Sequence, residues 1–228
     1  MRGSRAGLTA LRVLGFMFTL AVWMVIEHND HPYRVVIATI SVLLTFPTLL
    51  WFRKLLDKSP TQERCAWLTS ILHILLMVLF GVAIIETLVE YSRSPRWFLP
   101  VPRIIGGVLL LITGFFTLLT VLNLALSGLG APFAIALSRR LVNRWMYAWT
   151  RNPMVVSTLS CLCSVALFFQ SMQFLVWILV ILSPAWLFFL KVYEERELEI
   201  RFGESYLEYK KTTPFFWPKR PGKRDQMK

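Results

Sequence analysis

The chain has few of the residues that build a disulfide-linked or metal-binding protein. Cysteine occurs three times in 228 residues, which is too few for a disulfide framework. The histidines are also three: His28 and His31 fall in one short polar loop, and His73 lies inside an apolar run. Cys161 and Cys163 are two residues apart in another apolar run, so on a helix they point to different faces. We therefore expect no bound metal.

Acidic residues are scarce as well. They number 13 against 25 lysines and arginines, which gives a net charge of +12. In a soluble protein so positive a charge would indicate nucleic acid. The basic and aromatic pattern of a nucleic-acid module is missing, however, and we expect no nucleic acid as a partner. The charge instead favours the cytoplasmic loops of a membrane protein and their contact with anionic lipids.

Apolar sequence is what the chain has in excess. Hydrophobic residues make up 56% of it, against about 45–50% in a soluble domain. A membrane-spanning helix needs roughly 20 mostly apolar residues, and four runs meet this requirement, at 8–26, 35–52, 66–89 and 104–126. The first run follows two arginines, as a signal peptide does, but no clear small-residue cleavage site follows it. We interpret it as a retained first span.

Two shorter apolar runs follow, at 154–169 and 174–190. The four residues between them predict a tight helical hairpin with a kink at Pro184 in its second arm. Whether this hairpin crosses the bilayer is left open by its length. The sequence thus predicts an all-α integral membrane protein with four transmembrane helices, a C-terminal helical hairpin and a cytoplasmic amphipathic helix.

The distribution of lysine and arginine predicts the orientation. On this topology 21 of the 25 lie on one side, in the N-terminus, the second and fourth loops and the tail. Positive charge marks the cytoplasmic side, so we expect both termini and the fourth loop in the cytoplasm. The chain divides into a four-span bundle (1–126), a part with a cytoplasmic loop, the hairpin and a C-terminal helix (127–218), and a basic tail predicted to be disordered (219–228).

The segment VYEERELEIRFGESYLEYKK, residues 192–211, holds six of the thirteen acidic residues. If it continues the hairpin as a helix past Gly203, one face carries a carboxylate followed by apolar and aromatic side chains: Glu194, Leu198, Phe202, Tyr206 and Tyr209. Glu195 and Glu199 flank this face. The structural alternative is an amphipathic helix on the headgroup layer with its tyrosines at the interface.

The fourth loop, LVNRWMYAWTRNPM at 141–154, holds the other concentration of polar groups. It brings Tyr147, Arg151 and Asn152 to the membrane surface, and Pro153 opens the next apolar helix. An arginine beside a helix N-terminus suits a carboxylate or phosphate, although an interfacial aromatic and arginine belt is the structural alternative.

The hairpin returns the two polar segments to the same side of the membrane. One site can then combine a cation, free backbone donors, aromatic faces and paired carboxylates. This set suits S-adenosylmethionine, which has a carboxylate, an adenine ring, ribose hydroxyls and a positive centre. Nicotinamide nucleotides share several of these groups and stay an alternative.

At these residues the sequence resembles the isoprenylcysteine carboxyl methyltransferases and their phospholipid methyltransferase relatives. Two blocks carry the resemblance, which covers about residues 139–218: Leu141, Val142, Tyr147, Arg151, Asn152 and Pro153, then Glu194, Glu195, Leu198, Phe202, Gly203, Tyr206 and Tyr209, closed by Thr213, Pro214 and Pro218. The departures are Trp145 for a family glycine, Val155 for a tyrosine and Arg139 for a histidine. Lys191 is nearest to the place of an arginine that the carboxyl methyltransferases use near the acceptor.

The resemblance implies an enzyme that binds S-adenosylmethionine between the fourth loop and the Glu194 helix, from the cytoplasm, while a lipid or lipidated acceptor arrives sideways from the bilayer. Arg151, Glu194 and Glu195 are the implied catalytic residues. The implied cofactor-binding residues are Tyr147, Arg151, Asn152, Pro153, Met154, Glu194, Glu195, Leu198, Phe202, Tyr206 and Tyr209. Arg151, Asn152 and the helix start would hold the methionine carboxylate, the two glutamates the ribose hydroxyls or amino group, and Tyr206 or Phe202 the adenine.

The histidines bear on the acceptor. A carboxylate is already a nucleophile at pH 7, whereas an amine must first lose a proton. Because we expect no histidine near the site, a carboxylate such as a prenylcysteine is favoured over a phospholipid amine, unless Glu194, Glu195 or water takes the proton. Two other functions stay open: an NADPH-dependent reductase of the sterol reductase type, and a non-catalytic membrane protein with this fold.

Overall fold

The structure is a computed structural model that describes residues 2–28, 32–93, 97–128, 138 and 140–218. Within these ranges the secondary structure is helical, apart from an isolated bridge between Phe98 and Ser171. The predicted all-α fold is confirmed. Among the described residues, five helices are long and apolar enough to cross a membrane. The predicted basic tail at 219–228, His31 and Arg139 lie outside the described residues.

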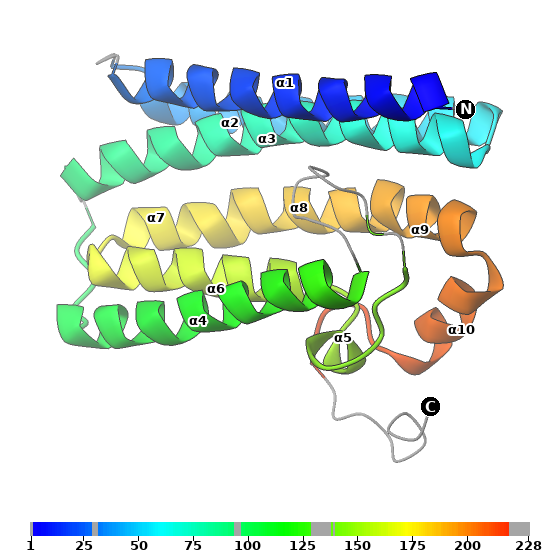
Figure 1. Cartoon of the computed structure of the whole chain (residues 1–228). Coiled ribbons are helices and arrows are strands. Elements are labelled where there is room, and N and C mark those ends of the chain that lie inside the picture. Colours follow the sequence, from blue (N-terminus) through cyan, green and yellow to red (C-terminus); the bar gives the residue numbers. More distant parts are fainter. Residues whose placement is uncertain (1, 29–31, 94–96, 129–137, 139, 219–228) are drawn as a thin grey trace.

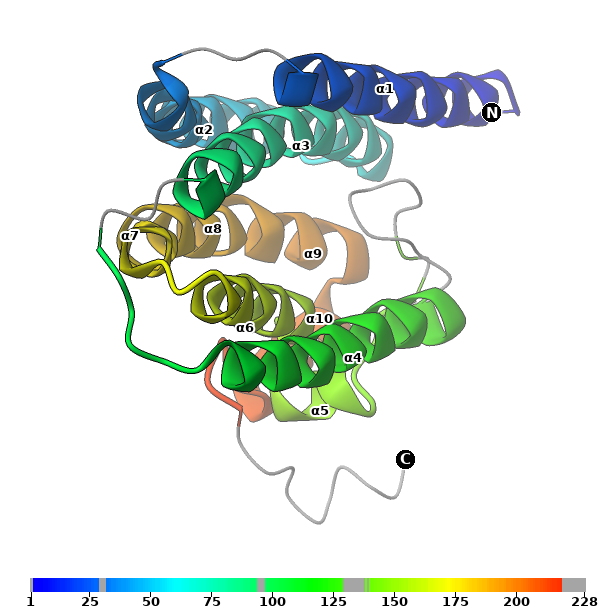
Figure 2. The ribbon, with the colours of Figure 1, turned by 90° about the vertical axis from the view of Figure 1, so that its left-hand side faces the viewer.

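The first three helices form one layer of the molecule. They are α1 (Arg2–His28), α2 (Arg34–Lys58) and α3 (Gln62–Arg93), and both α1 and α2 pack against α3 (Figures 1 and 2). Long apolar runs become helices here because a helix satisfies its own backbone hydrogen bonds, as a lipid environment requires. Arg34 and Glu86 form a buried ion pair of 2.8 Å between α2 and α3.

The second half of the chain packs beneath this layer. In it, α4 (Arg103–Gly128) lies along α6 (Pro153–Phe168) (Figure 1). Their helices approach closely at Gly106, where a Cβ atom would lie 2.4 Å from the backbone nitrogen of Phe168. Only glycine allows this contact, because an added methyl group there would overlap with backbone rather than with a movable side chain.

The predicted hairpin is present, and its second arm continues as a helix through the polar segment up to Gly203, as predicted. It runs from α7 (Met172–Trp177) through α8 (Ser183–Phe189) to α9 (Glu195–Phe202), with π-helical segments at Ile178–Leu182 and Leu190–Glu194. The whole is one helix of 31 residues, roughly 46 Å at 1.5 Å per residue, and therefore long enough to cross a bilayer. The first π-helical segment ends two residues before Pro184, whose ring removes one backbone donor.

The long second arm lies at the centre of the core. Ile178, Leu182 and Tyr193 on this arm, and Leu49 and Leu72 on α2 and α3, are all fully buried. By contrast α1 and α4 keep most of their apolar side chains exposed, as expected for lipid-facing helices. The core thus holds the second arm, and with it α9, in a fixed position.

Among the described residues, the segments on the side richer in lysine and arginine come to one end of the molecule. This end collects the start of α1, the turn between α2 and α3, the end of α4, α5 (Met146–Trp149), α9 and α10 (Glu204–Thr212) (Figure 1). The two polar segments singled out in the sequence are therefore neighbours, as the hairpin predicts.

Candidate active site

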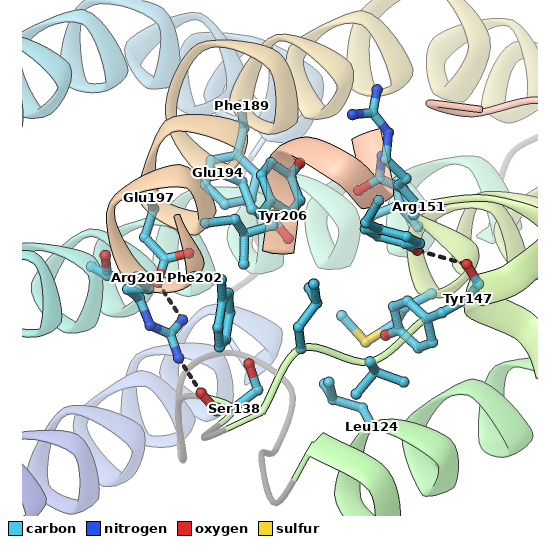
Figure 3. Close-up of a pocket in the computed structure, with 18 of the residues that line it drawn as sticks. Leu124, Ser138, Tyr147, Arg151, Phe189, Glu194, Glu197, Arg201, Phe202 and Tyr206 are labelled. Carbon is cyan, nitrogen blue, oxygen red and sulfur yellow. Dashed lines mark hydrogen bonds and ion pairs between the residues drawn. The ribbon is translucent and has the colours of Figure 1, made fainter. Parts of the chain in front are cut away.

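A pocket of about 170 Å³ opens where α9, α10 and the connection between α4 and α6 meet (Figure 3). Glu194, Tyr206 and Arg151 lie along one side of it, and Leu124 and Ser138 lie across from them. Nine of the eleven predicted cofactor-binding residues line this pocket: Tyr147, Arg151, Asn152, Met154, Glu194, Leu198, Phe202, Tyr206 and Tyr209. Pro153 and Glu195 do not.

The helix predicted to continue past Gly203 is interrupted there. Gly203 adopts φ 54° and ψ −132°, ends α9 and starts α10. This conformation is accessible to glycine and strained for other residues. The single helical face considered from the sequence therefore does not exist. Phe202 and Tyr206 reach the same pocket because the chain turns between them (Figure 3).

Arg151 has unused hydrogen-bonding capacity at the pocket. Its backbone N–H donates to the carbonyl of Pro214 (2.9 Å), and its Nη2 lies 2.9 Å from Oε1 of Glu195. Within the described part of the chain, its buried Nε and Nη1 atoms have no hydrogen-bond partner. A buried donor without a partner costs about 1–3 kcal/mol, more when it is charged, so an anion in the pocket would be favoured here.

Glu195 lies behind Arg151 rather than at the pocket. Its carboxylate pairs with Arg151, with Lys210 on α10 at 2.9 Å and with Lys191 at 3.3 Å. Only 9% of its side chain is exposed. The structure therefore favours a positioning role for Glu195, in place of the predicted contact with the cofactor. Pro153 is buried at the first position of α6 and likewise contributes no pocket surface.

Asn152 is used mainly to fasten the C-terminal segment. Its Nδ2 donates to the carbonyl of Phe215 (2.7 Å), and the hydroxyl of Thr150 donates to the same oxygen (3.2 Å). This bond uses one of the two N–H donors of the Asn152 amide and leaves the other for the predicted role in holding an anion. The Phe215 ring also lies 5.7 Å below the Arg151 guanidinium, so the segment that closes the family pattern supports the arginine.

Glu194 and Glu197 both line the pocket, but only Glu197 has an ion-pair partner in the part of the chain that the structure describes. Glu197 is buried and pairs with Arg201 four residues later, and Arg201 also donates to the carbonyl of Ser138 (Figure 3). Glu194 also lines the pocket, and among the described residues no hydrogen bond or ion pair satisfies its carboxylate. A ligand with hydroxyl or ammonium donors would supply the missing partners.

The three tyrosines of the site are neutral and well held. The hydroxyl of Tyr209 donates to the carbonyl of Tyr147 (2.6 Å), which ties α10 to α5. Burial raises the pKa of Tyr147, and the charge of Glu194 raises it further. Burial also raises the pKa of Tyr206 and of Tyr209. All three therefore present phenols, not phenolates, over the physiological range.

The sequence reasoning missed one wall of the pocket. Thr69 and His73 on α3 line it, as do Glu197 and Arg201 on α9. The expectation that no histidine lies near the site is therefore wrong. Counting from the end where the polar segments meet, His73 is the twelfth residue of α3, so a count of helical turns from that end could have found it. The pair Glu197 and Arg201, spaced i and i+4 in a helix, was a second visible signal.

Comparison with protein-family models finds a match. The family model described as phospholipid methyltransferase matches residues 102–205, from the start of α4 to the start of α10. Searches of curated proteins and of solved structures gave no match. The matched segment contains both blocks of the candidate site up to Gly203 and leaves out α1 to α3. The resemblance inferred from the sequence is thereby confirmed: residues 102–205 match the phospholipid methyltransferase family, which consists of integral membrane methyltransferases.

Proposed function

We propose that this protein is an integral membrane methyltransferase that uses S-adenosylmethionine and a lipid-like acceptor. The observation that carries the proposal is the pairing, in one pocket, of the unpartnered guanidinium donors of Arg151 with the unpaired carboxylate of Glu194. The family match supports a methyl donor in that pocket over a nicotinamide cofactor.

The pocket residues fit the groups of this donor. Nε and Nη1 of Arg151 are free to bind its carboxylate, and the carboxylate of Glu194 is free to accept from its ribose hydroxyls or amino group. Phe202 and Tyr206 offer aromatic faces for the adenine. Tyr147, Met154, Leu198 and Tyr209 complete the surface. When bound, the sulfonium supplies an electrophilic methyl group for an in-line displacement.

The remaining task of the protein is alignment and exclusion of water. Glu195 and the Phe215 ring hold Arg151 in place, and the bond from Tyr209 to Tyr147 holds α10 against α5. Val142, Trp186 and Phe189 give the pocket an apolar wall. Because Trp186 and Phe189 belong to a membrane-spanning helix, an acceptor that carries an apolar chain from the bilayer suits this wall.

The group of the acceptor that receives the methyl group is a separate question from its apolar chain. The preference for a prenylcysteine carboxylate depended in part on the absence of a histidine, and His73 removes that part of the argument. A phospholipid amine is then supported by the presence of a nitrogen base in the pocket.

We place this end of the molecule in the cytoplasm, where its lysines and arginines contact anionic lipids.

Titration with candidate cofactors tests which cofactor binds, and transfer of a labelled methyl group tests the reaction. The protein purified in detergent is titrated by calorimetry with S-adenosylmethionine, S-adenosylhomocysteine and NADPH. Binding of the first two alone supports the proposal, and binding of NADPH alone would reject it in favour of a reductase. Binding of none favours the non-catalytic alternative.

Transfer of a labelled methyl group is then measured into vesicles that contain phosphatidylethanolamine and, separately, into N-acetyl-S-farnesylcysteine. Label in the first identifies an amine acceptor, and label in the second a carboxylate. Label in neither, despite donor binding, would reject both acceptor classes.

A further inference from the structure

His73 lines the pocket from outside the matched family segment. It belongs to α3, whereas the match begins at residue 102. Its ring lies 5.5 Å from that of Phe189 at an interplanar angle of 87°, and both residues line the pocket. This edge-to-face contact packs the imidazole against a second residue of the pocket lining.

The hydrogen bond of His73 determines which nitrogen carries the proton. Nδ1 lies 2.8 Å from the backbone carbonyl oxygen of Thr69. A carbonyl oxygen only accepts, so Nδ1 must donate. In the neutral ring Nε2 then keeps a lone pair and is a proton acceptor. Within the described ranges, Nε2 has no hydrogen-bond partner.

We propose that Nε2 of His73 takes the proton that the acceptor group loses during methyl transfer. This inference rests on the proposed function. An ammonium group has no lone pair; once it gives a proton to Nε2, the amine nitrogen attacks the methyl carbon of the sulfonium donor. The C–N bond forms as the C–S bond breaks, and that electron pair goes to sulfur. His73 later releases the proton to water.

The other charged groups at the ring do not take over this role. Arg12 on α1, whose Nε donates to the hydroxyl of Ser70 (2.9 Å), and Arg201 on α9 both act electrostatically on His73. Arginines stay protonated over the whole physiological range. Glu197 is engaged by Arg201, and Glu194 is assigned to the donor. His73 is thus the neutral base available on the α3 side of the pocket.

His73→Gln tests the assignment, with His28→Gln as the matched control. Gln keeps a hydrogen-bonding group but cannot carry the proton. His28 makes the same i to i−4 bond from Nδ1, to Met24 at 2.9 Å, but it is exposed at the far end of α1. We expect His73→Gln to slow methyl transfer to phosphatidylethanolamine vesicles by about 10²- to 10⁴-fold and His28→Gln to leave it unchanged. The affinity for S-adenosylhomocysteine should stay within about twofold in both.

Two readouts separate proton transfer from structural damage. Below the pKa of the amine, the rate of His73→Gln should rise about tenfold per pH unit, because only the already neutral amine reacts; a uniform loss at all pH values would overturn the proposal. Nitrogen NMR of ¹⁵N-histidine-labelled protein, with the variant identifying the signal, should show His73 protonated on Nδ1. Protonation on Nε2 instead would also overturn it.

Failure of the role proposed for His73 can be distinguished from failure of the proposed function. The wild-type protein could bind S-adenosylhomocysteine and methylate the amine while the His73→Gln variant is equally active. That result would reject only the role of His73 and leave the proposed function standing. A wild-type protein that binds no donor and transfers no methyl group rejects the proposed function and this inference together.

Discussion

At the scale of single residues, two adjacent glutamates have different environments. Glu194 faces the pocket without a partner, whereas Glu195 is enclosed by Arg151, Lys191 and Lys210. A free carboxylate at a pocket is available to a ligand. A carboxylate with three cationic partners instead contributes to the position of those cations and to the stability of the fold.

Exchange of each glutamate for glutamine should separate these two roles. We expect Glu194→Gln to raise the dissociation constant of S-adenosylhomocysteine about tenfold, as for loss of a hydrogen bond to a charged group, with an unchanged melting temperature. Glu195→Gln should cost about 1–3 kcal/mol of stability, or several degrees of melting temperature. Calorimetric titration and thermal unfolding in detergent measure both. Equal effects of the two variants would contradict the division.

How far the sequence predicts the site differs from residue to residue. The spacing of Glu194, Leu198 and Phe202 on one helix brings them to the pocket because a helix repeats every 3.6 residues. The assignment of Glu195 could not be made in this way, since its partner Lys210 belongs to a helix beyond the Gly203 turn. His73 was missed because it belongs to a helix that is distant in the sequence, and packing rather than local pattern decides which residues of α3 face the pocket.

At the scale of elements, Gly203 sets the direction of α10. A Cβ at this position would meet no atom within 4 Å. The cost of a larger residue is therefore backbone strain alone, about 1–3 kcal/mol for a residue held in a sparsely populated region. Relief of that strain would rotate α10 and move Tyr206 and Tyr209 away from the pocket.

Gly203→Ala should therefore lower both stability and donor affinity. Gly114→Ala is the matched control, because Gly114 also has open space around a Cβ but lies within α4 and does not adopt positive φ. Alanine is favoured over glycine inside a helix by about 1 kcal/mol, so the control should be neutral or stabilising. The measurements are thermal unfolding and titration with S-adenosylhomocysteine. The prediction fails if both variants behave alike.

The contact between α4 and α6 gives a second element-scale prediction. A Cβ at Gly106 would come within 2.4 Å of the Phe168 backbone, whereas one at Gly107 would make an ordinary contact of 3.7 Å with the Phe168 ring. We expect Gly106→Ala to destabilise the protein by about 1–3 kcal/mol, the usual cost of overpacking, and Gly107→Ala to have little effect. Thermal unfolding of the two variants measures the difference, and a Gly106→Ala protein as stable as the wild type would show that the helices can separate freely.

The elements themselves were largely predictable from the sequence. Apolar runs of about 20 residues are sufficient to predict helices that span a bilayer, and those in α1 to α4 agree with the structure. The apolar run of the second hairpin arm ends at Leu190, but the helix continues to Phe202, as predicted for the polar segment up to Gly203. The charged residues that extend it are stabilised by tertiary ion pairs, such as the one between Arg196 and Asp57 at 3.0 Å, which periodicity alone does not show.

At the scale of the whole molecule, the two ends differ in charge and in chemistry. The pocket, α5 and α10 lie at the end that also contains the start of α1 and the turn between α2 and α3 (Figure 1). The opposite end contains the buried pair of Arg34 and Glu86 near the start of α2. Positive charge is retained on the cytoplasmic side of a membrane, so the asymmetry predicts how the whole protein is inserted.

Cysteine labelling measures this orientation. In a variant with the three native cysteines replaced by serine or alanine, a single cysteine at Gln62 tests the pocket end and one at Tyr33 the opposite end; both positions are exposed. In intact cells a maleimide that cannot cross the membrane should react with the cysteine at Tyr33 and spare the one at Gln62, and cell rupture should expose both. Reaction at Gln62 alone in intact cells would reverse the orientation, and the pocket would then face away from the cytoplasmic supply of methyl donor.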